Sequence, residues 1–166
     1  MSECSHHLLA SKLSRPLTIH CVSGCWGDLL RILQHTCTAS IQSGRPWSIV
    51  LHSCNTLPVE MVVAFNKIPG LYYSLSSKSR SDKLQRLLLS IPRDRLLLET
   101  DSPDQLPADL KRDLRGGGGS KDRQLRYNEP TLLRYNCLQI AQLMGVSEAD
   151  LAAVTFRNSK TAFNLQ

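Results

Sequence analysis

The chain has 166 residues, of which 42% are hydrophobic, which suits one globular domain with a sizeable core better than two. Lys and Arg number 20 against 14 Asp and Glu, and the resulting formal charge of +6 favours anionic partners such as nucleic acid, although general solubility explains it equally well. No apolar run approaches the roughly 20 residues of a membrane span, and no apolar block near the start marks a signal peptide. We expect a single domain over residues 1–166 without membrane contact.

The cysteines indicate a reducing environment. They lack the dense, short spacing of a secreted disulfide scaffold, so we expect most of them to carry reduced thiols. The expected location is therefore intracellular, cytoplasmic or nuclear, and organelle targeting is left open if further sequence precedes the first residue. The six cysteines are Cys4, Cys21, Cys25, Cys37, Cys54 and Cys137.

The first part of the chain alternates helical and extended patterns. Residues 5–14 predict the back half of a helix, with Leu9 and Leu13 four apart on one face. Arg15-Pro16 ends it, because proline fixes its own φ and pushes the preceding residue toward extended geometry. The expected elements that follow are a strand over 17–20, a helix over 28–35, a polar connection over 36–46, a strand over 49–52 and a helix over 58–65.

The second part continues the alternation. Residues 71–75 predict a third strand, and Ser81 is placed to cap a helix whose apolar residues recur at i, i+3, i+4 and i+7. A fourth apolar strand, Arg95-Leu-Leu-Leu-Glu-Thr-Asp-Ser-Pro103, ends at two carboxylates. Residues 104–127 are expected to form a flexible polar loop containing the run Gly116-Gly-Gly-Gly-Ser120.

Two helices are expected to close the chain. Asn128 is placed to cap the first, Gly145 to end it, and Ser147 to cap the second. The predicted apolar side of the first of these helices comprises Leu133, Cys137, Ile140, Ala141 and Met144. Strands that alternate with helices predict an α/β fold with a parallel sheet, in which ligands bind at the carboxyl ends of the strands.

Side chains able to bind a metal follow three of these strands. His20 and His52 each end a strand, and Glu99 and Asp101 follow the apolar part of the fourth, where alternation would place them on one face. Imidazole and carboxylate groups together suit zinc, manganese and related divalent ions. A single histidine at a strand end is more often a residue that only forms hydrogen bonds within the protein. Three strands that each end in a histidine or a carboxylate favour a metal site, in which Glu99 would hold a metal ligand in place without binding the metal itself.

Two other patterns offer alternative interpretations. The histidines with Cys21, Cys25, Cys37 and Cys54 could form a zinc set, but their spacing fits no tight finger. Basic residues in the 104–127 loop could follow a phosphodiester backbone, or could simply be solvated. The candidate substrate-binding residues among them are Arg112, Arg115, Lys121 and Arg123.

With these residues in view, the chain resembles the TatD-related deoxyribonucleases, metal-dependent hydrolases of the amidohydrolase-like barrel group. The resemblance runs over most of residues 8–165, and its most specific part is Leu97-Leu-Glu-Thr-Asp-Ser-Pro-Asp104. Further matching segments are Arg15-Pro-Leu-Thr-Ile-His-Cys21, Ile49-Val-Leu-His-Ser53, Leu71-Tyr-Tyr-Ser-Leu-Ser76, Tyr127-Asn-Glu-Pro130 and Arg157-Asn158.

The resemblance implies a (β/α)8 TIM-type barrel that cleaves DNA with divalent metal ions (Mg, Mn or Zn), two of them in a complete member. His20 and His52 would bind one metal, and Asp101 would bind the other and accept the proton of the attacking water. Members of the family begin with a strand bearing His-x-His and carry a Glu on the fourth strand, and this chain has neither; His6-His7 cannot replace the pair. The chain is therefore expected to correspond to the last four βα units of an N-terminally truncated barrel, since a complete barrel needs about 250 residues.

Such a half-barrel would leave one sheet face and one strand edge open. If the 166 residues are the whole protein, we expect self-association, pairing with another half-barrel, or poor solubility; a stable monomer in size-exclusion chromatography would contradict this. Whether the chain is an enzyme stays open among three functions: part of a working nuclease, an inactive half-barrel acting as a binding or regulatory partner, or a metal-independent module that binds nucleic acid.

Overall fold

The computed structural model describes residues 9–10, 13, 15–21, 24–41, 48–77, 81–108, 110 and 127–165, with the side chains of 37–41 left out. Most of the predicted 104–127 loop lies outside these residues, including the glycine run and all four basic residues proposed to bind substrate. Of the predicted first helix, Leu9, Ala10 and Leu13 are described as helical, and both leucines are exposed.

Four parallel strands form the sheet, as the alternation of elements predicts, in the order β1-β2-β3-β4. They are β1 (Leu17–His20), β2 (Ile49–His52), β3 (Leu71–Leu75) and β4 (Leu96–Leu98). In the register of β1 with β2, His20 lies directly beside His52. The parallel arrangement brings all the carboxyl ends to one edge of the sheet.

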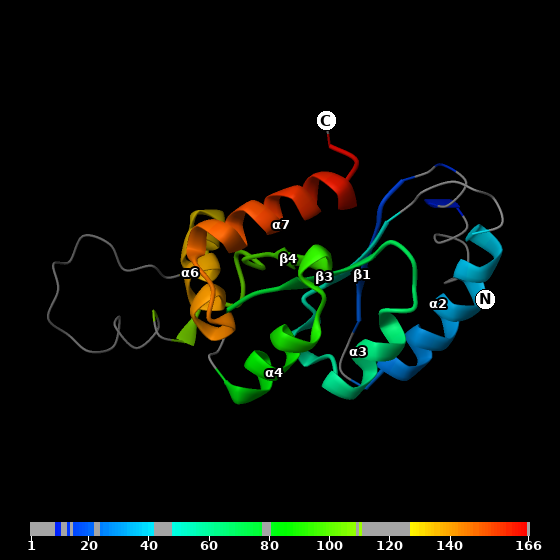
Figure 1. Ribbon diagram of the computed structural model, residues 1–166, viewed down its shortest axis with the longest axis horizontal. Helices are drawn as coiled ribbons and strands as arrows, with labels where there is room; N and C mark the ends of the chain where they lie inside the picture. Colours follow the sequence, from blue (N-terminus) through cyan, green and yellow to red (C-terminus); the bar gives the residue numbers. More distant parts are fainter. Residues whose placement is uncertain are drawn as a thin grey trace, which may run out of the picture.

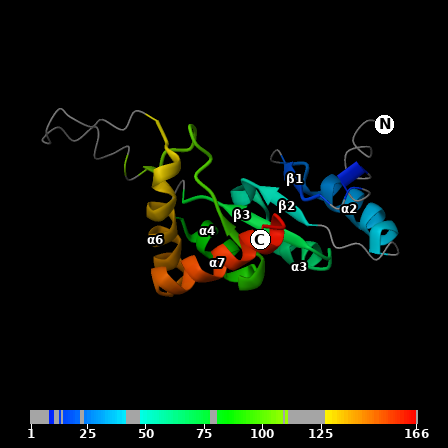
Figure 2. The same cartoon turned by 90° about the horizontal axis from the view of Figure 1, so that it is seen from above.

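Helices cover both faces of the sheet. In Figures 1 and 2, α2, α3 and α4 lie on one side of the sheet, and α7 lies on the other. The helices are α2 (Trp26–Ile41), α3 (Val59–Phe65), α4 (Asp82–Ser90), α6 (Leu133–Met144) and α7 (Glu148–Ala162), with single 3-10 turns η1 (Cys54–Thr56), η2 (Arg93–Arg95) and η3 (Pro130–Leu132).

The main hydrophobic core lies on the face covered by α2, α3 and α4. Ile49 and Leu51 of β2 point into it with Tyr73 of β3, and all three are fully buried. Trp26 at the start of α2 packs edge-on against Phe65 of α3, with ring centroids 6.2 Å apart. Alternation along the strands sends the intervening side chains, including His20 and His52, to the opposite face.

That opposite face is only partly open. Val50 and Leu97 are each 2% exposed because Ala162 near the end of α7 packs against them. Thr18 and His20 of β1 remain exposed, and β1 has no strand partner besides β2 among the described residues. On this face, α7 therefore packs against β2 and β4, while the side chains of Thr18 and His20 on β1 stay exposed.

Two predicted helix boundaries were wrong. The helix predicted over 28–35 extends from Trp26 to Ile41, and Thr36, predicted to begin a polar connection, is buried within it and donates its hydroxyl to the carbonyl of Ile32 (2.7 Å). Asn128 does not cap α6, which begins at Leu133 after η3. Its side-chain amide donates instead to the carbonyls of Thr100 and Asp104, fastening the segment that follows β4.

The other predicted caps are confirmed. Ser81 accepts a hydrogen bond from the backbone N–H of Leu84 (3.2 Å), Ser147 accepts one from Asp150 (3.0 Å), and Gly145 ends α6 with φ +66°. On α6 the predicted apolar side is buried at Cys137, Ile140 and Ala141, but Leu133 is 43% exposed.

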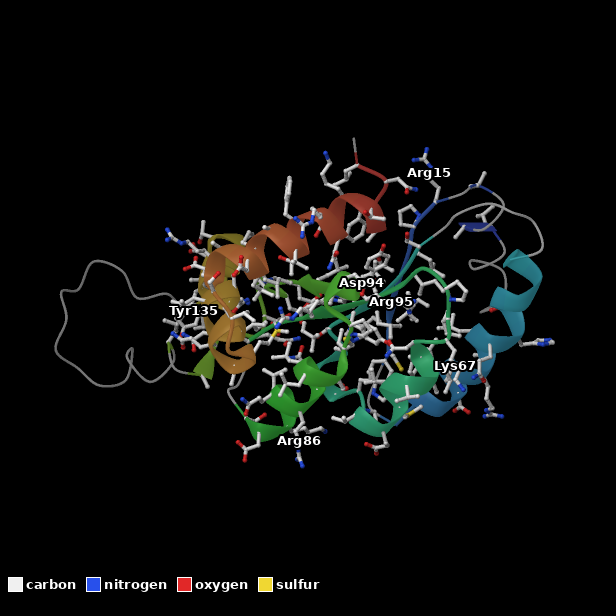
Figure 3. The ribbon with its side chains drawn as sticks, in the orientation of Figure 1. Arg15, Lys67, Arg86, Asp94, Arg95 and Tyr135 are labelled. Carbon is white, nitrogen blue, oxygen red and sulfur yellow. The ribbon has the colours of Figure 1, made fainter. Side chains whose placement is uncertain are left out.

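Arg95 fixes the amino end of β4. Its guanidinium donates to the carbonyls of Asn66 (2.9 Å) and Ile68 (3.3 Å), in the segment between α3 and β3. Figure 3 shows Arg95 beside Asp94 in the middle of the molecule, whereas Arg86 lies at its periphery. None of the helices in the described part of the chain has the length and apolarity needed to cross a membrane.

Candidate functional site

His52 lies between the two carboxylates that follow β4. Its ring nitrogen Nδ1 is 2.7 Å from Oε2 of Glu99, and Nε2 is 3.1 Å from Oδ1 of Asp101. An ionised carboxylate can only accept hydrogen bonds, so the Glu99 contact places a proton on Nδ1. In the neutral imidazole, Nε2 then carries a lone pair and faces Asp101.

His20 is the nearest of the remaining predicted site residues. Its ring centroid lies 5.4 Å from that of His52, at an interplanar angle of 47°. His20 is exposed on the open edge strand, whereas the side chain of His52 is 31% exposed. All four predicted residues, His20, His52, Glu99 and Asp101, thus meet at the carboxyl end of the sheet.

Glu99 is held from several sides. Ser74 on β3 donates its hydroxyl hydrogen bond to Oε2, the same oxygen that meets His52. The backbone carbonyl of Glu99 accepts from the amide of Asn136 on α6 (2.9 Å). Its other oxygen, Oε1, is buried with no hydrogen-bond partner among the residues that the structure describes. Glu99 can therefore fix the ring orientation of His52, as a carboxylate behind a metal-binding histidine does.

Asp101 reaches His52 through a turn, which alternation along a strand did not anticipate. The strand ends at Leu98, and Asp101 has φ +58°. Ser53 after β2 (φ +51°) and Gln105 (φ +55°) share this left-handed conformation, which costs a non-glycine residue about 1–3 kcal/mol. These are three of the four non-glycine residues with positive φ in the described part of the chain, and the fourth, Asn164, follows α7.

Sequence patterns missed three polar residues of this site. Ser74 supports Glu99, while Ser53 and Gln105 belong to the hydrogen-bonding group around Asp101. The position of Ser74 on β3 carried a usable signal, because alternation places it on the same face as His52. Gln105 lies in an irregular segment, where no sequence pattern indicated its position near Asp101.

The fit of a divalent metal can be tested on the His52–Asp101 contact. Two lone-pair atoms 3.1 Å apart repel each other unless a proton or a cation neutralises them, and imidazole with carboxylate is a donor pair that divalent ions accept. These two residues fit a metal. However, no three His, Cys, Asp or Glu side chains in the described residues form a complete ligand group.

The alternative zinc set is weakened by Cys54. Its thiol is buried and donates to the carbonyl of Ser74 (3.3 Å), and burial, followed by the charge of Glu99, raises its pKa well above the ordinary 9.0. Metal binding by cysteine requires the thiolate. Cys54 is thus a structural thiol, while the side chain of Cys37 lies outside the described residues.

Cys54 also predicts a loss of stability in alkaline solution. The folded protein keeps its proton while the unfolded chain releases it above about pH 9, so the free energy of unfolding should fall by up to about 1.4 kcal/mol per pH unit above that point. Burial raises the pKa of Tyr73 as well, from 10.0, and adds to the loss at higher pH. Urea denaturation between about pH 8 and pH 11 measures the slope.

The matched comparison for this prediction is Cys54→Ala against Cys25→Ala, since Cys25 is exposed. The first substitution should reduce the slope that begins near the ordinary thiol pKa of 9.0, and the second is the control for removing a cysteine from an exposed position. An equal slope in wild type and Cys54→Ala would contradict the assignment.

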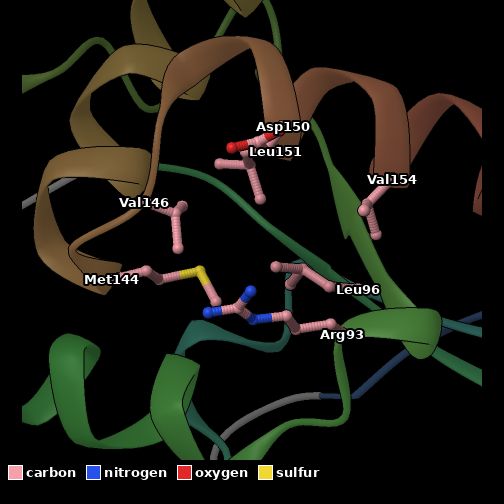
Figure 4. A pocket seen from close by; sticks show the side chains of 7 residues that line it. All are labelled: Arg93, Leu96, Met144, Val146, Asp150, Leu151 and Val154. Carbon is pink, nitrogen blue, oxygen red and sulfur yellow. The ribbon is translucent and has the colours of Figure 1, made fainter.

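A pocket elsewhere in the molecule is separate from this site. It lies at the amino end of β4 beneath α6 and α7 (Figure 4), so the length of the strand separates it from Asp101. It is lined by Arg93, Leu96, Met144, Val146, Asp150, Leu151 and Val154. Among the predicted site residues that the structure describes, His20, His52, Glu99 and Asp101, none lines it.

Comparison with known proteins gives the family of this chain. The family profile described as TatD related DNase matches residues 4–164. The chain is 35% identical to the 3'-5' ssDNA/RNA exonuclease TatD of Erwinia tasmaniensis, in a match that covers 95% of this chain and 55% of that protein. It is 33% identical to the protein of the same name from Erwinia amylovora, and this match also covers 95% of this chain and 55% of the relative. It thus spans about half the length of these curated relatives.

Solved structures agree on the fold. The hydrolase TatD family protein from Entamoeba histolytica superposes with a TM-score of 0.69 at 19% identity, covering 96% of this chain and 55% of that one. An uncharacterized amidohydrolase from Saccharomyces cerevisiae gives 0.67 at 18% identity, covering 95% and 57%. The profile match over nearly all of the sequence shows that this chain belongs to the TatD-related DNase family.

Proposed function

We propose that this chain supplies His52 and Asp101 to a divalent-metal site that hydrolyses the phosphodiester bonds of single-stranded DNA or RNA from the 3′ end. The observation that carries the proposal is the 3.1 Å contact between Nε2 of His52 and Oδ1 of Asp101, at the carboxyl end of a parallel sheet. Membership of a nuclease family and the names of the exonuclease relatives support the substrate class.

Each residue has a distinct task in this proposal. His52 binds through Nε2 because Glu99 occupies Nδ1, and Asp101 binds through Oδ1 or accepts a proton from the attacking water. Glu99, with Ser74 behind it, keeps the imidazole in one orientation. A bound divalent ion would make a coordinated water more acidic and neutralise charge on the phosphate. His20, on the neighbouring strand, is placed as a further ligand.

The choice of metal follows from the number of protein donors. Mg²⁺, which keeps several waters and uses one or two carboxylates together with substrate phosphates, needs little more than Asp101 supplies. A catalytic zinc site takes three protein ligands and would need additional donors. Mn²⁺ accepts both carboxylate and imidazole ligands, and is therefore the best first ion to test.

The sheet is proposed to be the last four βα units of an eight-stranded barrel, completed by a complementary half-barrel. The open edge of β1, with Thr18 and His20 exposed, is the place where such a unit would add its strands. Further metal ligands would then come from the added strands. Arg112, Arg115, Lys121 and Arg123 follow the site in sequence and are proposed to contact the nucleic-acid backbone.

The test uses the purified chain, alone and after mixing with a half-barrel that supplies the complementary strands, with a single-stranded DNA labelled at its 5′ end, and a matched RNA, in Mg²⁺, Mn²⁺ or Zn²⁺. The expected product is a ladder of 5′-labelled fragments that shorten progressively from the 3′ end and that disappear in EDTA. A substrate with phosphorothioate linkages at its 3′ end is the control and should resist. Internal cutting would refute the exonuclease assignment, and cutting that persists in EDTA would refute the metal.

A second candidate function is favoured by one observation, the lack of a complete three-residue ligand group among the described residues. In that case the chain binds nucleic acid or a partner protein without turnover. Binding that survives EDTA and weakens steeply with salt, together with no cleavage in any metal, would support this function over the nuclease.

A further inference from the structure

The Gln105 side chain joins three segments around Asp101. Its amide nitrogen Nε2 donates to Oδ2 of Asp101 and to the hydroxyl of Ser53, the latter at 2.8 Å. Its amide oxygen accepts from the hydroxyl of Ser76, 3.2 Å away. The segments that follow β2, β3 and β4 thus meet at one amide group.

The partners of Gln105 are themselves fixed. Ser76 is 1% exposed, and its backbone N–H and carbonyl are both bonded to the side chain of Asn55 in η1, at 3.2 and 2.7 Å. Ser53, next to His52, has φ +51°, and Gln105 itself has φ +55°. A residue held in this conformation, with its amide bonded at both ends, has little freedom to turn away from Asp101.

We propose that Gln105 is a positioning residue that makes Asp101 a one-oxygen ligand. Its N–H group occupies Oδ2, and this leaves Oδ1 directed at Nε2 of His52. Without it, the carboxylate is free to rotate, bind through both oxygens or leave the histidine. The inference rests on the proposed function, because the metal is what Oδ1 is positioned for.

The side chain must be a donor for this role. A carboxylate at position 105 would face Asp101 with like charge and would also add a ligand, so Gln105→Glu gives no clean answer. Gln105→Met keeps the length and most of the volume but has no N–H group to donate. Gln105→Asn keeps the amide but is one methylene shorter, and asparagine tolerates the left-handed backbone better than most residues.

The test measures Mn²⁺ binding alone, by calorimetry, in wild type, Gln105→Met and Gln105→Asn. We expect the dissociation constant to rise about tenfold or more in both variants, the usual effect of losing a group that orients a metal ligand. The control is Gln85→Met, since Gln85 donates to the carbonyl of Leu143 (2.9 Å) between α4 and α6 and should leave the affinity unchanged. Unchanged affinity in both Gln105 variants would overturn the inference.

A metal-free measurement separates this inference from the proposed function. Crystal structures of the metal-free wild type and Gln105→Met should differ in the Asp101 carboxylate, which is expected to lose its contact with His52 in the variant. Absence of Mn²⁺ binding by wild type would refute the metal function alone. If the Asp101 carboxylate keeps its position in Gln105→Met, the positioning role is refuted. If Gln105→Met fails to fold, the position of the Asp101 carboxylate in Gln105→Asn is compared with that in wild type instead.

Discussion

Replacing Asp101 with asparagine is expected to abolish metal-dependent cleavage, lowering the rate by roughly 100- to 10,000-fold, the range that a positioned proton acceptor contributes. Asparagine keeps the shape of the side chain but loses the negative charge that faces Nε2 of His52. It therefore removes the charge that Asp101 needs in the proposed site, whether Asp101 binds the metal or accepts the proton of water. Initial rates on the 3′-unblocked single strand, with Mn²⁺ in excess, measure the effect.

The matched control is Asp104→Asn, which changes the same charge on an exposed side chain three residues further along the chain. It should retain nearly all activity. His52→Ala should lose as much as Asp101→Asn, and the double variant should lose little more, since both residues belong to the one proposed metal site. Full activity of Asp101→Asn, with wild-type nucleic-acid binding, would refute the proposed site.

Replacing Asn158 with alanine should produce the largest loss of stability outside the hydrophobic core. The Asn158 side chain on α7 is 8% exposed, and its amide donates to the carbonyls of Arg93 and Leu96, each at 2.8 Å. Both carbonyls flank the start of β4 and would lose a buried donor. We expect a loss of roughly 2–4 kcal/mol in the free energy of unfolding, equivalent to a fall in Tm of about 5–15 °C.

Two companion variants isolate the donor. Asn158→Asp preserves the shape but turns a carboxylate toward the two carbonyls, so its loss should equal or exceed that of alanine. Arg157→Ala changes the exposed neighbour and should stay within about 0.5 kcal/mol of wild type. Thermal and urea denaturation give the values. A change below about 0.5 kcal/mol in Asn158→Ala would show that α7 is not fastened to β4 by this side chain.

Sequence patterns located features that depend on near neighbours in the chain. Ser81 and Ser147 were identified as caps, and Gly145 as a helix end, because each contact joins residues a few positions apart. The prediction failed at Asn128, which has the right residue type for a cap but bonds to Thr100 and Asp104, more than twenty positions away. A sequence pattern cannot rank a local hydrogen bond against a distant one.

By itself, therefore, the sequence determined the parallel α/β order and the four strands, since strand alternation and helical periodicity are properties of short segments. It also placed four candidate site residues at the carboxyl ends of the strands: His20, His52, Glu99 and Asp101. Only the tertiary structure decided which atoms meet. It placed Glu99 against Nδ1 of His52 and Asp101 against Nε2, and it brought Gln105 to Asp101. Those contacts depend on strand register and on left-handed turns after the strands, which are fixed by packing across the whole sheet.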